Sequence, residues 1–141
     1  MTRKNPYGAY EKTNVHTADQ RQLIIMLYDG AIRFLNKAND CIERSDIEGA
    51  HGFLLRAREI VNELMVTLRP EKGGKIGENL KRLYVYMFNR LVEANLTKDK
   101  VIVDEVISLL STLREGWSGI KAKKTVDHTD TDSLKRVSVQ G

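Results

Sequence analysis

The residues that could do chemistry in this 141-residue chain are few and widely spaced. The three histidines, His16, His51 and His128, lie in separate segments. None has a second histidine three or four positions away, as zinc-binding helices require. The single cysteine, Cys41, falls inside an apolar-periodic stretch, where a small buried hydrophobe is the usual role. Because a phosphate-binding glycine pattern is also missing, these residues predict no catalytic site and no bound metal or cofactor.

Asp29 is the one carboxylate that directly follows a dense apolar run, residues 23–28. A catalytic acid or base needs a reacting partner within hydrogen-bond reach, and the neighbouring sequence offers none. We therefore expect Asp29 to pair with Arg33 one turn on, or with a cation on another helix. Together these residues predict a protein that is not an enzyme.

Composition and charge narrow the class of protein and its partners. Apolar residues make up 41% of the chain and charged residues 30%, as in ordinary soluble proteins. No apolar run is long enough for a membrane span and no apolar signal segment begins the chain, so we expect a cytoplasmic protein without membrane insertion. The net charge of +4 comes from residues 1–17 (three basic, one acidic) and 121–141 (five basic, three acidic), whereas residues 18–120 hold 15 basic and 15 acidic residues. Because the folded part lacks a basic excess, we expect no nucleic-acid partner.

Apolar residues recur at helical spacing in four segments separated by short connections. This pattern predicts an all-α fold, an antiparallel up-down-up-down four-helix bundle. We expect an irregular N-terminal arm over residues 1–16, the bundle over 17–120 and a flexible polar tail over 121–141. The four predicted helices span residues 17–44, 45–68, 76–95 and 97–120.

Capping signals mark the predicted helix ends. Thr17–Gln20 and Ser45–Glu48 match capping boxes, with Thr17 and Ser45 as the N-caps. Pro70 is expected to stop the second helix and to be followed by a Glu-Lys-Gly-Gly loop. The third helix is expected to end with a left-handed Asn95, and the fourth to be capped by Thr97 or Asp99.

Each predicted helix has a stripe of apolar residues that we expect to face the core. The four stripes are Leu23, Leu27, Ala31, Phe34, Ala38 and Cys41; Ile47, Ala50, Leu54, Ala57, Val61, Leu64 and Leu68; Ile76, Leu80, Leu83, Met87, Leu91 and Ala94; and Ile102, Val106, Leu109, Leu113 and Trp117. Gly30 interrupts the first helix at its centre, where glycine costs about 1 kcal/mol relative to alanine. We expect it to mark close packing against another helix, or else a flat spot for a partner's backbone.

Three segments carry more apolar residues than a bundle helix needs to face its neighbours. Residues 23–28 and 83–88 are apolar throughout, and Val103, Ile107 and Leu110 lie beside the fourth stripe. A helix that is apolar all round cannot be covered by three neighbours in so small a protein. The arm, a second copy of the chain or a protein partner could cover the excess. The alternative is that these residues are simply core or singly exposed apolar side chains.

Five groups of residues, in register, carry a family resemblance. They are Asn5-Pro-Tyr-x-x-Tyr10; Met26-Leu-Tyr-Asp-Gly-Ala31; Ala50-His with Leu54-Leu-Arg-Ala57 and Glu63-Leu; Leu83-Tyr-x-Tyr-Met87 with Arg90-Leu-x-Glu-Ala-Asn95; and Leu109-Leu-x-x-Leu-Arg114 with Trp117. In this order and spacing the chain resembles the FliS family of flagellin-export chaperones over about residues 5–117. The C-terminal tail is longer than the family pattern, so the resemblance implies nothing about it.

The resemblance implies a cytoplasmic chaperone that binds the disordered C-terminal segment of flagellin and prevents its premature polymerisation. It also implies delivery of that client to the flagellar type III export gate, contact with the export-gate membrane protein, and an N-terminal arm that lies over part of the client surface. We therefore expect the partner-binding residues to be Tyr7, Tyr10, Leu23, Met26, Leu27, Tyr84, Tyr86, Val103, Ile107 and Leu110. The alternative is a homodimeric helical adaptor or scaffold protein with no flagellin client, which buries the same apolar surface on itself.

Overall fold

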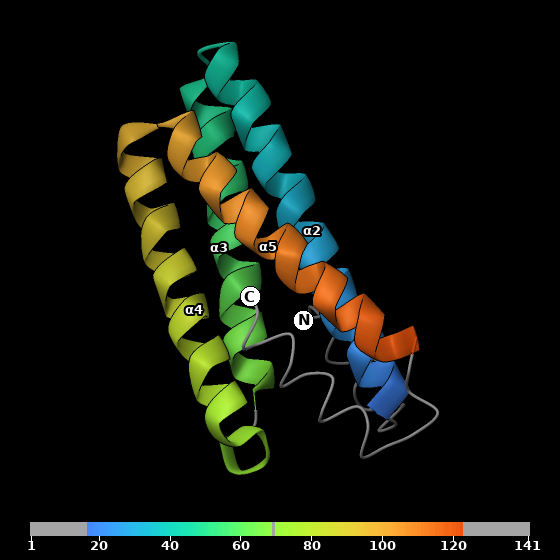
Figure 1. The fold of residues 1–141 in the computed structure, drawn as a ribbon. Coiled ribbons are helices and arrows are strands. Elements are labelled where there is room, and N and C mark those ends of the chain that lie inside the picture. Colours follow the sequence, from blue (N-terminus) through green and yellow to red (C-terminus); the bar gives the residue numbers. More distant parts are fainter. Residues whose placement is uncertain (1–16, 69, 123–141) are drawn as a thin grey trace, which may run out of the picture.

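The computed structural model describes residues 17–68 and 70–122 of the chain, and this part contains four α-helices and no strand. The helices are α2 (Thr17–Glu43), α3 (Ile47–Thr67), α4 (Pro70–Thr97) and α5 (Lys100–Ala122). Each helix packs against the one before it, and α5 also packs against α2, which closes the ring of four. Short connections make consecutive helices antiparallel, so the predicted up-down-up-down bundle is confirmed (Figure 1). The predicted arm, and the predicted tail beyond Ala122, lie outside the described residues.

The core runs along the whole bundle and draws apolar side chains from all four helices. The predicted stripe of α3 is confirmed in its central part, where Ala50, Leu54, Ala57, Val61 and Leu64 are buried. Cys41 is also buried and has a free thiol, as expected for a small core residue. Close packing explains the central glycine of α2, because a Cβ on Gly30 would lie 3.2 Å from Cδ1 of Ile60 on α3.

In three helices the buried side chain is one residue later than the sequence predicts. Leu35 is buried instead of Phe34, Tyr84 instead of Leu83, and Leu110 instead of Leu109; the predicted residues are only half-buried. Adjacent residues on a helix lie about 100° apart, so two consecutive apolar residues can both border one broad stripe. The positions of the neighbouring helices decide which of the two is covered.

The connection between α2 and α3, residues 44–46, is longer than predicted and is capped by a different residue. Asp46, and not Ser45, is the N-cap of α3, because its Oδ1 accepts a hydrogen bond of 3.0 Å from the backbone N–H of Gly49. Ser45 instead takes a left-handed conformation, with φ of 61°, which reverses the chain between the two helices. As a result Ile47, predicted to face the core, lies in the first turn of α3 and is 55% exposed.

Pro70 begins a helix and does not simply end one. α3 ends at Thr67, after which Leu68 is extended with φ of −71° and ψ of 141°. Proline fits the first turn of a helix because its missing N–H needs no partner there. The predicted loop over residues 71–74 is therefore a helical turn, which ends where Gly74 takes φ of 54° and kinks α4.

α4 ends at Thr97, two residues later than predicted, and the left-handed residue after it lies three residues later than predicted. Asn95 was expected to be the left-handed residue, but it is helical, and Lys98 takes that conformation with φ of 55°. Lysine has no intrinsic preference for the left-handed conformation. A hydrogen bond of 2.6 Å from the backbone N–H of Lys98 to the carbonyl of Ala94 closes the helix there. Of the two predicted caps for α5, Asp99 is confirmed, since its Oδ1 accepts from the N–H of Val101 at 2.9 Å.

Gly49→Ala tests the α3 cap. An added Cβ would lie 2.4 Å from Oδ2 of Asp46 and 2.8 Å from Sγ of Cys41, so the capping carboxylate must move away from the Gly49 amide. We expect the free energy of unfolding, measured by urea denaturation, to fall by about 1–2 kcal/mol. The control is Gly52→Ala in the same helix, where no atom lies within 4 Å of the added Cβ. This variant should gain up to about 1 kcal/mol, and equal destabilisation of both variants would contradict the assignment of the cap.

Candidate partner-binding site

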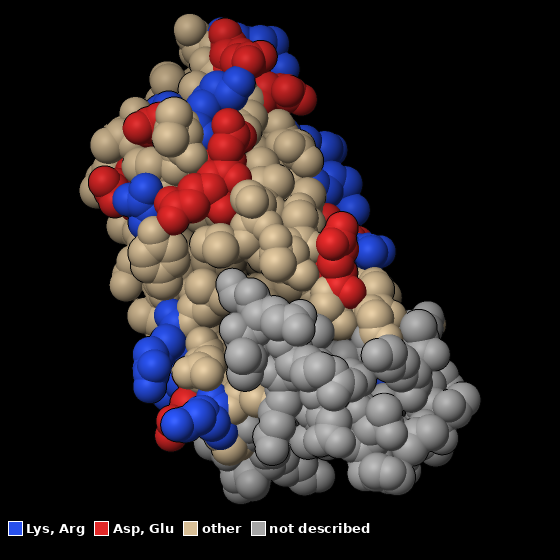
Figure 2. Space-filling view, viewed as in Figure 1, with Lys and Arg blue, Asp and Glu red and all other residues tan. Residues whose placement is uncertain are grey.

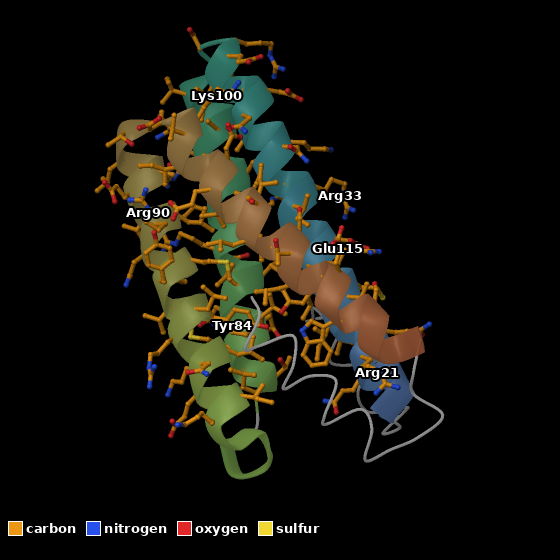
Figure 3. The ribbon with its side chains drawn as sticks, in the orientation of Figure 1. Arg21, Arg33, Tyr84, Arg90, Lys100 and Glu115 are labelled. Atoms are coloured by element: carbon orange, nitrogen blue, oxygen red, sulfur yellow. The ribbon has the colours of Figure 1, made fainter. Side chains whose placement is uncertain are left out.

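A buried cluster of polar aromatic side chains joins three of the four helices. The hydroxyls of Tyr28 on α2 and Tyr84 on α4 are hydrogen-bonded to each other, and Nε1 of Trp117 on α5 donates to the Tyr28 hydroxyl at 3.1 Å. Both tyrosines are fully buried; Figure 3 shows Tyr84 inside the bundle. Burial raises the pKa of Tyr28 to about 12 and raises the pKa of Tyr84 well above its usual range. Both hydroxyls are neutral at physiological pH, and their hydrogen bonds hold α2, α4 and α5 together.

Charged and polar pairs attach α5 to α2 along its length. Near the C-terminal end of α5, Arg114 donates to Asp29 in a bidentate pair, with Nε to Oδ1 at 2.5 Å and Nη2 to Oδ2 at 3.3 Å. This confirms that Asp29 pairs with a cation on another helix. Further towards the other end of α5, Asp104 accepts from Asn39 at 2.8 Å, and Lys100 pairs with Glu43. Exposed ion pairs add little stability, so their main consequence is to set the register between the two helices.

The contact between α4 and α5 depends on one carboxylate. Glu105 accepts from the hydroxyl of Tyr86 at 2.5 Å and from Nε of Arg90 at 2.8 Å, and Arg90 also bonds Glu93 at 2.8 Å. The hydrogen bonds from Tyr86 and then from Arg90 lower the pKa of Glu105, so it stays ionised. Figure 3 shows Arg90 on α4, on the side where α5 crosses.

Beyond Glu105, towards the C-terminal end of α5, the helices α4 and α5 separate (Figure 1). In Figure 1, α4 and α5 start together at their short connection and diverge towards their opposite ends, and among adjacent helix pairs theirs has the sparsest contacts. Along this edge lie half-buried apolar side chains at helical spacing from Tyr86 and Glu105: Leu83, Leu109, Leu113 and Trp117. These four residues with exposed Tyr86 form what we call the α4–α5 seam. The seam offers a strip of partly exposed apolar residues to a partner helix.

Half of the predicted partner-binding residues are core residues. Leu23, Leu27, Tyr84, Val103 and Leu110 are almost completely buried, so the prediction that they face a partner is corrected for this structure. A helix that is apolar all round was expected to be too broad for three neighbours to cover. The bundle covers most of residues 23–28 because α2 contacts both of its neighbours closely, and Tyr28 also reaches Tyr84 across the bundle.

The remaining described residues of the predicted site do not share one face. Met26 is exposed one turn before Gly30, on the side of α2 that packs against α3. Tyr86 is exposed at the α4–α5 edge, where it bonds Glu105. Ile107 is half-buried and lies one turn after Asp104, which contacts α2. Tyr7 and Tyr10 lie outside the described residues.

Four seam residues were predicted to lie in the core but are partly exposed. Leu83, Leu109, Leu113 and Trp117 all stand in the predicted inward stripes, yet each is only half-buried. A signal was present in the sequence, since Leu83 precedes Tyr84 and Leu109 precedes Leu110, and either member of each pair could face inward. Only the splay of α4 from α5, which depends on all four helices, decides between them.

The described surface has a further hollow, which lies beside α3. It has a volume of about 620 Å³ and is lined by Leu55, Arg58, Glu59, Ile60, Asn62, Glu63 and Phe88. Its charges are mixed, and the Arg58 guanidinium lies 5.0 Å from the centre of the Phe88 ring. Among residues 17–68 and 70–122, no cluster of His, Cys, Asp and Glu is placed to hold a metal ion, and no helix is long and apolar enough to cross a membrane.

Comparison with known proteins decides the family. A family model described as "Flagellar protein FliS" matches residues 3–124. The chain belongs to the FliS family. It is 34% identical to the flagellar secretion chaperone FliS of Bacillus subtilis (strain 168) over 83% of this chain and 86% of that protein. It is 42% identical to the flagellar secretion chaperone FliS of Salmonella typhimurium (77% of this chain, 82% of that protein) and 38% identical to FliSB of Pseudomonas aeruginosa (77% and 86%).

Membership of the FliS family confirms the resemblance carried by the five sequence groups. It gives the chain an export-chaperone role in flagellum assembly, which is not an enzymatic role. Three of the groups contribute to the buried cluster, since Tyr28 belongs to the α2 group, Tyr84 to the α4 group and Trp117 to the α5 group. The residues that carry the family resemblance thus include those whose hydrogen bonds join α2, α4 and α5.

Tyr28→Phe tests the buried hydroxyl cluster through its pH dependence. The pKa of Tyr28 is raised from 10.0 in the unfolded chain to about 12, so between these values the unfolded chain binds fewer protons than the folded one. The stabilising contribution is complete below about pH 10 and is lost as the pH rises towards 12. Between about pH 9 and about pH 11 the parent chain should lose about 1 kcal/mol more of its unfolding free energy than Tyr28→Phe. Urea denaturation at the two pH values measures this, and an equal loss in both proteins would contradict the assignment.

Proposed function

We propose that this FliS chain binds the disordered C-terminal segment of flagellin along the α4–α5 seam. The observation that carries the proposal is a strip of half-buried apolar side chains at the edge where two bundle helices are least tightly packed. An amphipathic client helix has its apolar residues three or four positions apart, which matches the spacing of Leu109, Leu113 and Trp117 on α5. The relatives are named flagellar secretion chaperones, which supports a client that is secreted during flagellum assembly.

The energetics suit a chaperone that must later release its client. Ordering a disordered segment costs about 2–5 kcal/mol. At about 25 cal/mol per Å², burial of roughly 80–200 Å² of apolar surface offsets that cost. The seam side chains are already partly covered by the bundle, so each adds a moderate amount of apolar burial on binding. Binding is then favourable through several small contributions, and no single deep contact must be broken for release.

Coverage of the flagellin C-terminal segment by the chaperone determines whether flagellin can polymerise. A flagellin whose C-terminal segment lies on the chaperone cannot use that segment to join other subunits, so premature polymerisation in the cytoplasm is prevented. We further propose that the loaded chaperone delivers flagellin to the flagellar type III export gate by contact with the export-gate membrane protein. The arm residues Tyr7 and Tyr10 are proposed to contribute to the client surface, as the family resemblance implies.

The seam is tested by calorimetric titration of full-length flagellin into variants of the chain. Leu109→Ser and Leu113→Ser should each weaken binding about tenfold, because each removes half-exposed apolar surface from the seam. Val66→Ser is the matched control, since Val66 is 70% exposed on α3 and belongs to the other side of the bundle. It should leave the affinity within about twofold.

The same titration tests the client itself. Flagellin lacking its C-terminal segment should show no binding, and undiminished binding would refute the proposed client. The rival hypothesis, a homodimeric scaffold, predicts instead a tight dimer at submicromolar concentration that ignores flagellin. Sedimentation velocity with and without flagellin separates the two, because only the chaperone forms a mixed one-to-one complex.

Tyr10→Ala tests the arm separately from the bundle. We expect weaker flagellin binding with an unchanged unfolding transition, because Tyr10 precedes the first described helix and is proposed to contact the client. Calorimetry and urea denaturation on the same preparation measure both quantities. An unaltered affinity would remove Tyr10 from the client surface while leaving the seam proposal intact.

A further inference from the structure

The opposite edge of the bundle carries a surface of different chemistry. Because α2 contacts α3 and α5 while α4 contacts α3 and α5, the α2–α3 edge lies across the bundle from the α4–α5 seam. On this edge the rings of Phe34 on α2 and Phe53 on α3 stack with centroids 6.0 Å apart and an interplanar angle of 25°. We call these two rings and the three cations around them, Arg33, Lys37 and Arg56, the α2–α3 basic aromatic patch.

The three cations lie over the two rings and are exposed. The guanidinium carbons of Arg33 and Arg56 lie 5.9 Å and 5.6 Å from the centre of the Phe34 ring, and Nζ of Lys37 lies 5.7 Å from the centre of the Phe53 ring. Cation–π attraction at this range reduces the freedom of long side chains. Three exposed positive groups are thus held near the two rings before any ligand arrives.

No carboxylate neutralises these cations within residues 17–68 and 70–122. The ion pairs of this part of the chain involve other cations, and Asp29, one turn before Arg33, is held by Arg114 of α5. Figure 2 shows basic atoms along the outer edge of α2, where Figure 3 places Arg33 pointing away from the bundle. Residues 18–120 are balanced in charge overall, so three neighbouring cations without an acidic partner are a local excess.

Apolar surface adjoins the patch at one end. Met26 is 51% exposed and lies two turns before Arg33 on α2. A ligand that covers this edge therefore meets apolar atoms first and three positive groups next. A helical segment with apolar and acidic residues on one face has that order of groups.

We propose that the α2–α3 basic aromatic patch binds an acidic amphipathic segment of a protein partner, on the side of the bundle opposite the seam. Carboxylates of the segment accept hydrogen bonds from Arg33, Lys37 and Arg56, while its apolar residues cover Met26. A protein is favoured over a nucleic acid because the faces of both rings are occupied by each other and by the cations, so bases have no free ring on which to stack. The inference goes beyond flagellin binding and does not depend on it, since the two surfaces are separate.

The test uses a labelled helical peptide of about 18 residues, five turns, with leucine and glutamate on one face. Fluorescence anisotropy with the full chain should show binding at least about tenfold tighter than for a copy in which glutamine replaces glutamate. The triple variant Arg33→Gln/Lys37→Gln/Arg56→Gln should lose about tenfold in affinity for the acidic peptide. All three side chains are exposed, and circular dichroism checks that the variant keeps its helices.

A matched triple variant separates a site from general charge attraction. Lys75→Gln/Lys81→Gln/Arg82→Gln removes the same charge from exposed positions of α4 and should change the affinity less than about twofold. Equal loss in both triple variants, equal binding of the glutamine copy, or tighter binding of a single-stranded oligonucleotide of similar length would overturn the proposal. A preformed complex with the flagellin C-terminal segment should still bind the acidic peptide, and displacement of either ligand by the other would show that the surfaces are not separate.

Discussion

The hydroxyl of Tyr28 sets the strongest constraint on this bundle. It lies in an apolar core at zero exposure, where a polar group without a partner costs about 1–3 kcal/mol. Its partners, Tyr84 and Trp117, come from two other helices, so α2, α4 and α5 must approach one point together. Apolar side chains tolerate small shifts of one helix along another. This hydrogen-bonded cluster does not, and it fixes the position of α5 over the core.

The splay of α4 from α5 follows from that position. Trp117 and Arg114 both draw the C-terminal half of α5 towards α2, through Tyr28 and Asp29 respectively. At the other end of α5, Glu105 holds the helix against α4 through Tyr86 and Arg90. At that end Asp104 and Lys100 also bond α5 to α2, whereas Arg114, further along, bonds it to α2 alone, and in Figure 1 α5 diverges from α4 in this direction. The half-buried seam is thus a result of where polar groups pair and does not come from a shortage of apolar residues.

The sequence predicted element number, order and topology, because these depend on apolar periodicity over whole helices. It placed the ends less well: Asp46 caps α3 in place of Ser45, and Lys98 reverses the chain in place of Asn95. Such details depend on single hydrogen bonds that several neighbouring residues could make. The predicted core stripe was wrong by one residue at Leu83, because Tyr84, which follows it, is apolar too and is the residue that is buried. Side chains on the border of a stripe are the ones that form the seam, so the sequence was least informative where the surface matters most.

The two edges of the bundle differ because different pairs of helices make them. Where α2 packs closely on α3, the phenyl rings of Phe34 and Phe53 meet, and three long cationic side chains lie over them. Where α4 and α5 diverge, apolar side chains such as Leu113 remain half-covered. A client that binds by apolar burial and a partner that binds by charge therefore meet surfaces separated by the full width of the core. Because that core is close-packed and tied at Tyr28, occupation of one edge has no direct steric effect on the other.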